Sequence, residues 1–153
     1  MMRIHVLGCG NLLVGDDGFG VHVLKELEKR DLPSNIELIE AGTGGLDILN
    51  LIESTDKAII IDAVKSGGKI GNVYRFTEKD LPPSNMSLLS LHDLGLADVL
   101  KTGRIIQPKR MPKEIIIIGC EVQQADEIRL ELSPDVAKAV PVVVDMVLKE
   151  VGN

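Results

Sequence analysis

Short runs of apolar residues alternate along the chain with longer segments in which apolar residues recur every three or four positions. The runs are rich in β-branched residues and are bounded by glycine or polar residues, which is typical of strands. A run without polar alternation, such as 58–61, fits the middle of a parallel sheet that is covered on both faces. The predicted strands are 3–7, 36–39, 58–61, 72–77 and 115–119.

The segments with helical spacing carry apolar residues on one side and charged residues on the other. Either Asp16 or Asp17 is expected to cap the first of these helices. The last helix is expected to begin at Ser133-Pro134, and Pro141 is expected to bend it or to lie near its start. The predicted helices are 17–30, 46–54, 91–102 and 133 to the C-terminus.

The order of these elements predicts an α/β protein, a three-layer αβα sandwich around a sheet of about five mostly parallel strands. The strand at 72–77 is expected to run antiparallel, because the turn at 66–69 is too short for a parallel crossover. The chain has 153 residues, and neither a repeat nor a linker divides it. We therefore expect a single domain over residues 1–153.

Composition narrows the classes of partner. The chain has one tyrosine, two phenylalanines and no tryptophan, so its core is expected to be aliphatic. A net charge of −6 argues against binding to nucleic acid, whose phosphates an acidic surface repels. No apolar run is long enough to act as a signal peptide or to span a membrane. The two cysteines suggest no disulfide framework, and we expect a cytoplasmic protein without a membrane partner.

The loop after the first strand resembles a phosphate-binding turn in its Gly8-Cys9-Gly10 segment, and Glu40 at the end of the second strand could bind a ribose. Two features argue against a nucleotide. Leu13 occupies the third glycine position of that motif, and Asp16 and Asp17 lie where the start of the helix would receive a phosphate. One carboxylate about 5 Å from a phosphate charge costs roughly 3 kcal/mol at an effective dielectric near 20.

An acidic loop of this kind suits a cation instead. In parallel sheets, ligands bind outside the carboxyl ends of the strands, and Asp17, Asp62 and His92 all lie in segments expected at that edge. Each has an ordinary alternative: Asp17 as a helix cap, Asp62 as a cap of the next loop, and His92 as a first-turn polar residue. Together, two carboxylates and one imidazole favour six-coordinate manganese, iron or nickel over structural zinc.

Four blocks of sequence resemble, in order, those of the nickel-iron hydrogenase maturation endopeptidases. They are Gly8 to Val21 (GCGNLLVGDDGFGV), Gly42-Thr43, Ile60 to Ala63, and His92 to Leu100 (HDLGLADVL). The resemblance covers nearly the whole chain. It departs from the family where Ala41 replaces the first glycine of a Gly-Gly-Thr segment, a loop that is a candidate for contacting the substrate backbone.

The resemblance implies that Asp17, Asp62 and His92 bind metal and carry catalysis. It also implies an endopeptidase that removes the C-terminal tail of a hydrogenase large-subunit precursor, its partner, after nickel has been inserted. Nickel would then arrive with the substrate rather than reside in the enzyme. Hydrolysis could proceed by polarisation of the scissile carbonyl, by activation of a metal-bound water, or with a carboxylate as general base.

Other readings stay open at this point. A nickel-binding or chaperone-like module would use the same ligands without cleaving a bond, and a nucleotide-dependent enzyme would bind NAD or ATP. Cys9 is a weak candidate nucleophile, and no Gly-x-Ser-x-Gly elbow is present. The basic residues at 109–113 are expected to form a solvated loop, with a docking patch for an acidic partner as the alternative.

Overall fold

A five-stranded sheet lies at the centre of the structure, a computed structural model that describes residues 1–43, 45–81, 95–123 and 128–152. The strands are β1 (Ile4–Cys9), β2 (Ile36–Gly42), β3 (Lys57–Val64), β4 (Val73–Thr77) and β5 (Glu114–Glu121). They lie in the order β2-β1-β3-β5-β4, and every pair is parallel except β4 with β5. The predicted sheet and its antiparallel strand are confirmed.

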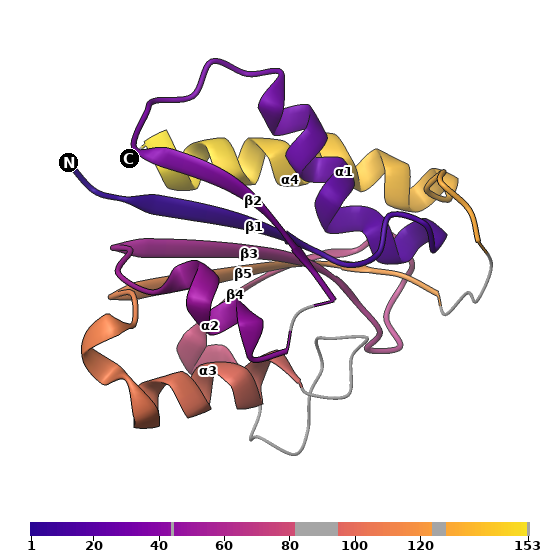
Figure 1. Ribbon diagram of the computed structural model, residues 1–153. Helices are drawn as coiled ribbons and strands as arrows, with labels where there is room; N and C mark the ends of the chain where they lie inside the picture. The colour runs from indigo at the N-terminus through magenta and orange to yellow at the C-terminus, as the bar shows by residue number, and fades with distance from the viewer. Residues whose placement is uncertain (44, 82–94, 124–127, 153) are drawn as a thin grey trace.

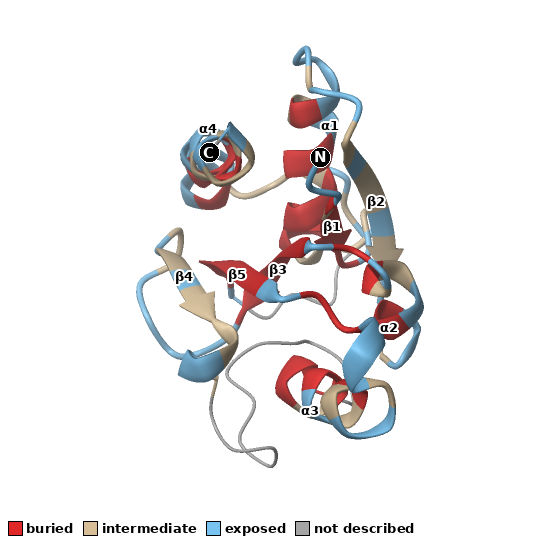
Figure 2. Ribbon diagram, turned by 90° about the vertical axis from the view of Figure 1, so that its left-hand side faces the viewer, coloured by how far each residue is buried: buried red, intermediate tan, exposed pale blue. Residues whose placement is uncertain are grey.

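Helices cover both faces of this sheet. The helices α1 (Phe19–Glu28) and α4 (Pro134–Gly152) lie on one face, and α2 (Asp47–Ile52) and α3 (Leu96–Ile106) lie on the other (Figure 1). Figure 2, which views the molecule from the side, separates the three layers. Three single turns of 3-10 helix complete the fold: η1 (Gly15–Gly18), η2 (Glu78–Asp80) and η3 (Pro108–Arg110).

The central strand β3 explains why both faces need cover. All eight of its residues are buried. Successive side chains of a strand point to opposite faces, so Ile59 and Ile61 join the cluster of α1 and α4, whereas Ala58 and Ile60 join the cluster of α2 and α3. A continuous apolar run is therefore the pattern that this position in the sheet requires.

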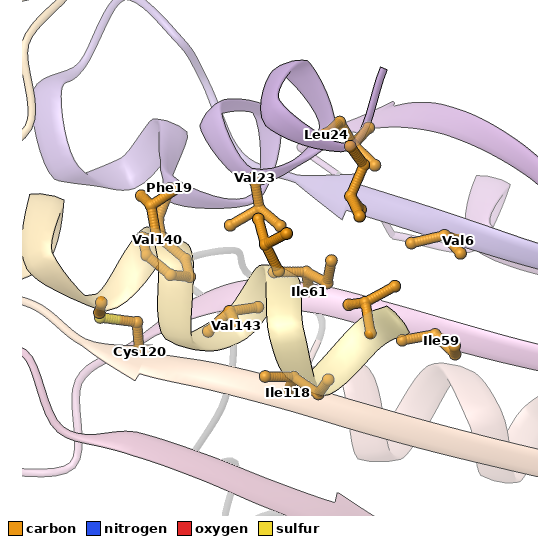
Figure 3. Packing of buried hydrophobic residues seen from close by; sticks show 14 of the residues in the cluster. Val6, Phe19, Val23, Leu24, Ile59, Ile61, Ile118, Cys120, Val140 and Val143 are labelled. Atoms are coloured by element: carbon orange, nitrogen blue, oxygen red, sulfur yellow. The ribbon is translucent and has the colours of Figure 1, made fainter. Parts of the chain in front are cut away.

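The larger of the two clusters is aliphatic, as expected. Val23 of α1 and Val143 of α4 belong to one buried cluster with Ile61 and Ile118 of the sheet (Figure 3). Phe19 is the only aromatic residue among the buried members of this cluster in the described part of the chain. Full burial of each such side chain stabilises the fold by about 1.5 to 3 kcal/mol before the cost of ordering the chain.

The start of α1 differs from the prediction. The helix begins at Phe19, its N-cap is Gly18, and no side chain caps it. Asp16 and Asp17 lie in the preceding turn η1, so the expectation that one of them caps α1 was wrong. The physical reason is that both carboxylates are engaged elsewhere, as described below.

Other strand and helix ends also differ from the predicted ones by a few residues. Strand β3 continues through Asp62 to Val64. Helix α3 begins at Leu96, and positions 91–94 of the predicted helix lie outside the described residues. Helix α4 begins at Pro134, as predicted, and Pro141 lies inside it. Among the described residues, no helix combines the length and apolar character that a membrane crossing requires.

Candidate metal-binding active site

The loop from β1 to α1 is closed at its base by glycines. Gly10 has φ of +112°, and a β-carbon there would overlap the carbonyl oxygen of Asp17. Only glycine adopts this conformation without strain and admits so close an approach. The Asn11 N–H donates a 2.8 Å hydrogen bond to Asp17 Oδ2 across the same loop. The backbone and side chain of Asp17 are therefore both held at the carboxyl end of β1.

Gly20 sets how closely α1 approaches the sheet. A β-carbon at Gly20 would collide with the backbone of Cys9 in β1 and of Ile61 in β3. The sequence argument looked for such a glycine at position 13 and missed that Gly20, the second residue of α1, supplies the close contact. The spacing of Gly18 and Gly20 was the available signal.

Asp62 is a buried carboxylate on the central strand. It is 3% exposed, and alternation along β3 places it with Ile60 on the sheet face that α2 and α3 cover. The N–H of Ala63 donates a 2.8 Å hydrogen bond to Asp62 Oδ1. Burial, opposed by that bond and reinforced by the charge of Asp17, raises the pKa of Asp62 from 3.8 to about 7.

Asp17 and Asp62 act on each other electrostatically. The charge of Asp17 helps to raise the pKa of Asp62. The pKa of the nearby Cys9 thiol is raised first by burial and then by the charges of Asp62 and Asp17. Asp17 Oδ1 is buried and has no hydrogen-bond partner among the described residues. Neither carboxylate forms an ion pair within the described part of the chain. Two such groups are costly to bury together unless a cation faces them.

Two further segments reach this edge of the sheet. The Gly10 N–H donates a 2.7 Å hydrogen bond to the carbonyl of Gly42, so the exposed Gly42-Thr43 segment lies beside the Asp17 loop. Buried Glu121 ends β5 and accepts hydrogen bonds from the Ser66 N–H, the Ser66 hydroxyl and the Tyr74 hydroxyl. Glu121 thereby fixes the turn that follows β3, a role that the sequence pattern did not reveal.

The comparisons with known proteins agree with this geometry. The family model described as hydrogenase maturation protease matches residues 21–150. This chain belongs to the hydrogenase maturation protease family. That membership makes it a peptide-bond hydrolase by class.

Relatives in this family align over almost their whole lengths. A Methanocaldococcus jannaschii protein provisionally named a hydrogenase maturation protease is 36% identical over 152 residues, which are 97% of this chain and 96% of that protein. The hydrogenase 2 maturation protease of Escherichia coli is 33% identical over 149 residues, 96% of this chain and 89% of its own. The solved structure of the E. coli hydrogenase maturating endopeptidase HybD superposes with a TM-score of 0.84 at 32% identity, over 97% of this chain and 91% of that one.

The third expected ligand of this family member, His92, lies outside the described residues. It precedes Gly95, the N-cap residue of α3, by three positions. Within the described residues, no group of three histidine, cysteine or acidic side chains is arranged to hold a metal ion. The structure thus brings Asp17 and Asp62 together, and the ligand role of all three residues stays a prediction.

The cysteines and the other histidines of this hydrolase have structural surroundings. Burial raises the pKa of Cys9 well above its usual range, which keeps the thiol protonated and argues against a nucleophilic role. Burial also raises the pKa of Cys120 to about 12. His5 Nδ1 lies 2.7 Å from the Leu51 carbonyl, and His22 Nε2 lies 3.1 Å from the Leu130 carbonyl. These contacts with backbone carbonyls are typical of structural histidines.

Proposed function

We propose that this protein is the endopeptidase that removes the C-terminal tail of a nickel-loaded hydrogenase large-subunit precursor. Asp17, Asp62 and His92 bind the nickel that the precursor carries and form the catalytic site. Nickel is part of the substrate in this proposal, and the precursor is the protein partner. The buried cysteines Cys9 and Cys120 are free thiols, which fits the cytoplasm as the compartment of the reaction.

One observation carries the proposal: the buried carboxylate of Asp62 and the half-buried carboxylate of Asp17, whose Oδ1 is buried, repel each other at one edge of the sheet without a cationic partner in the described residues. A divalent ion would offset the cost of burying them. Carboxylate oxygens and an imidazole nitrogen suit a six-coordinate ion whose other positions are taken by the ligands that arrive with it. In a precursor those ligands are cysteine thiolates, so the nickel would join the two proteins.

The repulsion between Asp17 and Asp62 also supports selection of a nickel-loaded precursor over an empty one. Before nickel is inserted, a precursor offers no cation to Asp17 and Asp62, and their mutual repulsion is unrelieved. After insertion, the divalent charge favours the ionised form of both groups. The enzyme would therefore bind mature metal centres more tightly than empty ones.

Hydrolysis requires a water to attack the scissile carbonyl and a proton to reach the leaving amine. Nickel can supply polarisation of that carbonyl or of the water. The carboxylate of Asp62, kept ionised by the nickel, can take the proton of the water as general base. The protonated carboxyl would then return the proton to the leaving nitrogen.

The mass of a purified precursor, with and without nickel, tests the proposal. We expect loss of the tail only when nickel-loaded precursor is incubated with the enzyme. The Asp62→Ala and Asp17→Ala variants should leave the precursor uncut while retaining the wild-type fold by circular dichroism. The matched control is Asp145→Ala, which removes an exposed aspartate on α4 and should cut normally.

Three outcomes would contradict the proposal. Full processing by Asp62→Ala would remove that residue from catalysis. Tight binding of the loaded precursor without any change in its mass would favour a nickel-binding module that does not cleave. Processing of a nickel-free precursor at the same rate would show that the carboxylates do not recognise the metal.

A further inference from the structure

Neighbouring aspartates of the first loop have opposite surroundings. Asp17 Oδ1 has no hydrogen-bond partner in the part of the chain that the structure describes. Asp16 is 5% exposed and both of its oxygens are bonded. The Ser133 N–H donates to Asp16 Oδ1 and the Ser133 hydroxyl donates to Asp16 Oδ2, each at 2.7 Å. Arg129 Nη2 lies 3.7 Å from Asp16 Oδ1. Asp16 therefore joins the loop to the start of α4.

The backbone repeats this connection. The Arg129 N–H donates to the Leu13 carbonyl at 2.8 Å, and the Gly15 N–H donates to the Arg129 carbonyl at 2.6 Å. These bonds form a short parallel bridge between Val14 and Arg129. The base of the loop is closed by Gly10 and its far part is held on residues 129–133. Of these two attachments, only the second involves a charged side chain.

The negative charge of Asp16 is compensated, so Asp16 can hold the loop without adding an unpaired charge beside Asp17. A second unpaired carboxylate beside Asp17 would strengthen the repulsion that already acts there. Asp16 instead faces the guanidinium of Arg129 and the N-terminal end of α4, whose dipole favours a negative charge. Helix α4 is itself held by buried contacts with α1 and the sheet, so it is a rigid support.

We infer that Asp16 is a positioning residue: it ties the Asn11–Asp17 loop to Ser133 and Arg129 so that the carboxylate of Asp17 faces the incoming nickel. This inference rests on the proposed function, because it assumes that Asp17 meets the metal of the precursor. Asp16 itself does not touch substrate. Its loss acts through the orientation of Asp17, and a misplacement of about 1 Å can cost on the order of a hundredfold in rate.

Four variants separate positioning from simple stability. Asp16→Asn keeps the shape and removes the charge, and Ser133→Ala removes one hydrogen bond from outside the loop. Ser133→Thr keeps the hydroxyl and should restore wild-type behaviour. The matched control is Thr55→Ala, which deletes a buried hydroxyl bonded at the same 2.7 Å to the Ile52 carbonyl, next to the opposite end of β3.

Two readouts are measured on each full-length variant. The first is kcat and KM for nickel-loaded precursor. The second is hydrogen exchange of the Asn11 amide by NMR, because that N–H donates to Asp17 Oδ2 and reports where the carboxylate lies. We expect Asp16→Asn to lower kcat/KM by about tenfold to a hundredfold and to speed Asn11 exchange. Ser133→Ala should change both in the same direction by less, and Thr55→Ala should change neither.

Wild-type kinetics and wild-type Asn11 exchange in Asp16→Asn would overturn the inference. So would losses in Asp16→Asn and Ser133→Ala that match only their unfolded fractions, or losses of equal size in Thr55→Ala. In both cases an inactive Asp17→Ala variant leaves the proposed function standing. If Asp17→Ala itself processes the precursor normally, the proposed function fails first and the positioning role fails with it.

Discussion

The two ends of β3 each bury a charge, and the fold treats them in opposite ways. Lys57, at the start of the strand, is 7% exposed. Its Nζ donates to Glu150 Oε2 at 2.8 Å and to the Glu150 carbonyl at 3.0 Å, and it lies 3.4 Å from Glu114. Asp62, near the other end, accepts one hydrogen bond from the described residues, from its own neighbour Ala63, and faces the like charge of Asp17.

This difference distinguishes a structural charge from a functional one. At the Lys57 end, burial acts to raise the pKa of Glu150, but hydrogen bonds from Arg75 and Lys57 outweigh it and lower that pKa, which favours the ionised carboxylate. At the Asp62 end, burial and repulsion dominate, and the carboxylate stays poorly compensated. An uncompensated buried charge lowers stability, and its retention at a sheet edge where ligands bind indicates a site that a cation completes.

The largest effect is expected on catalysis at the uncompensated end. Asp62→Asn keeps the size of the side chain and removes its charge, so processing of nickel-loaded precursor should fall by on the order of a thousandfold. The free energy of unfolding at neutral pH should not fall, because no ion pair is lost. Mass spectrometry and urea denaturation measure the two quantities. A large loss of stability would mean that Asp62 is compensated after all.

The raised pKa of Asp62 should also make the free energy of unfolding depend on pH. The pKa of Asp62 is raised from 3.8 to about 7 in the folded state, so between these values the folded protein binds more protons than the unfolded chain. The Asp62 contribution is therefore fully present below pH 4 and is lost as pH rises through 7. Relative to Asp62→Asn, the free energy of unfolding of the wild type should fall by at most about 4 kcal/mol over this pH range. The measurement is made in the presence of a metal chelator. A flat difference would contradict the raised pKa.

Breaking the compensated end should cost stability and spare catalysis. Lys57→Met removes the buried cation from the half-buried Glu150 and leaves it the ion pair with Arg75; removal of one partner from a buried ion pair costs about 3 kcal/mol. Urea denaturation measures the loss. The kcat/KM of the folded variant should match the wild type, because Lys57 lies at the edge of the sheet opposite to the site. Loss of activity beyond the unfolded fraction would show that the two ends are coupled.

The smallest effect on the free energy of unfolding is expected at Arg75, the more exposed of the two cations that contact Glu150. Arg75 donates a 2.6 Å hydrogen bond to Glu150 Oε1, but its side chain is 44% exposed. Arg75→Gln should therefore lower the free energy of unfolding by less than about 1 kcal/mol, since exposed ion pairs contribute little. A loss as large as that of Lys57→Met would assign the compensation of Glu150 to the arginine instead.

Much of the fold was predictable because the buried strands are visible in the sequence as continuous apolar runs. The runs at 58–61 and 115–118 became the central pair β3 and β5, and the short turn before β4 required its antiparallel direction. Strand ends were less predictable. Strand β3 continues past Asp62 because backbone pairing with β5 continues, with Asp62 opposite Gly119 and Val64 opposite Glu121. A sequence pattern that ends with its apolar residues cannot report such pairing.

The candidate site was predictable in part. The position of Asp62 after an apolar run and the acidic loop near Asp17 pointed to one edge of the sheet, where the structure brings the two residues into electrostatic contact. The different surroundings of Asp16, which bonds to Ser133, and of Asp17, which faces Asp62, were not predictable. Both are aspartates before a helix, and either satisfies the pattern of a cap.

The order of strands and helices, the aliphatic core and the family motifs follow from the sequence alone, because periodicity and local spacing are properties of neighbouring residues. Tertiary structure alone decided which buried charge is compensated. Ser133 lies 117 residues from Asp16, and Glu150 lies 93 residues from Lys57. Whether a carboxylate finds a donor depends on which distant segment the sheet and helices bring beside it, and that is settled only when the chain packs.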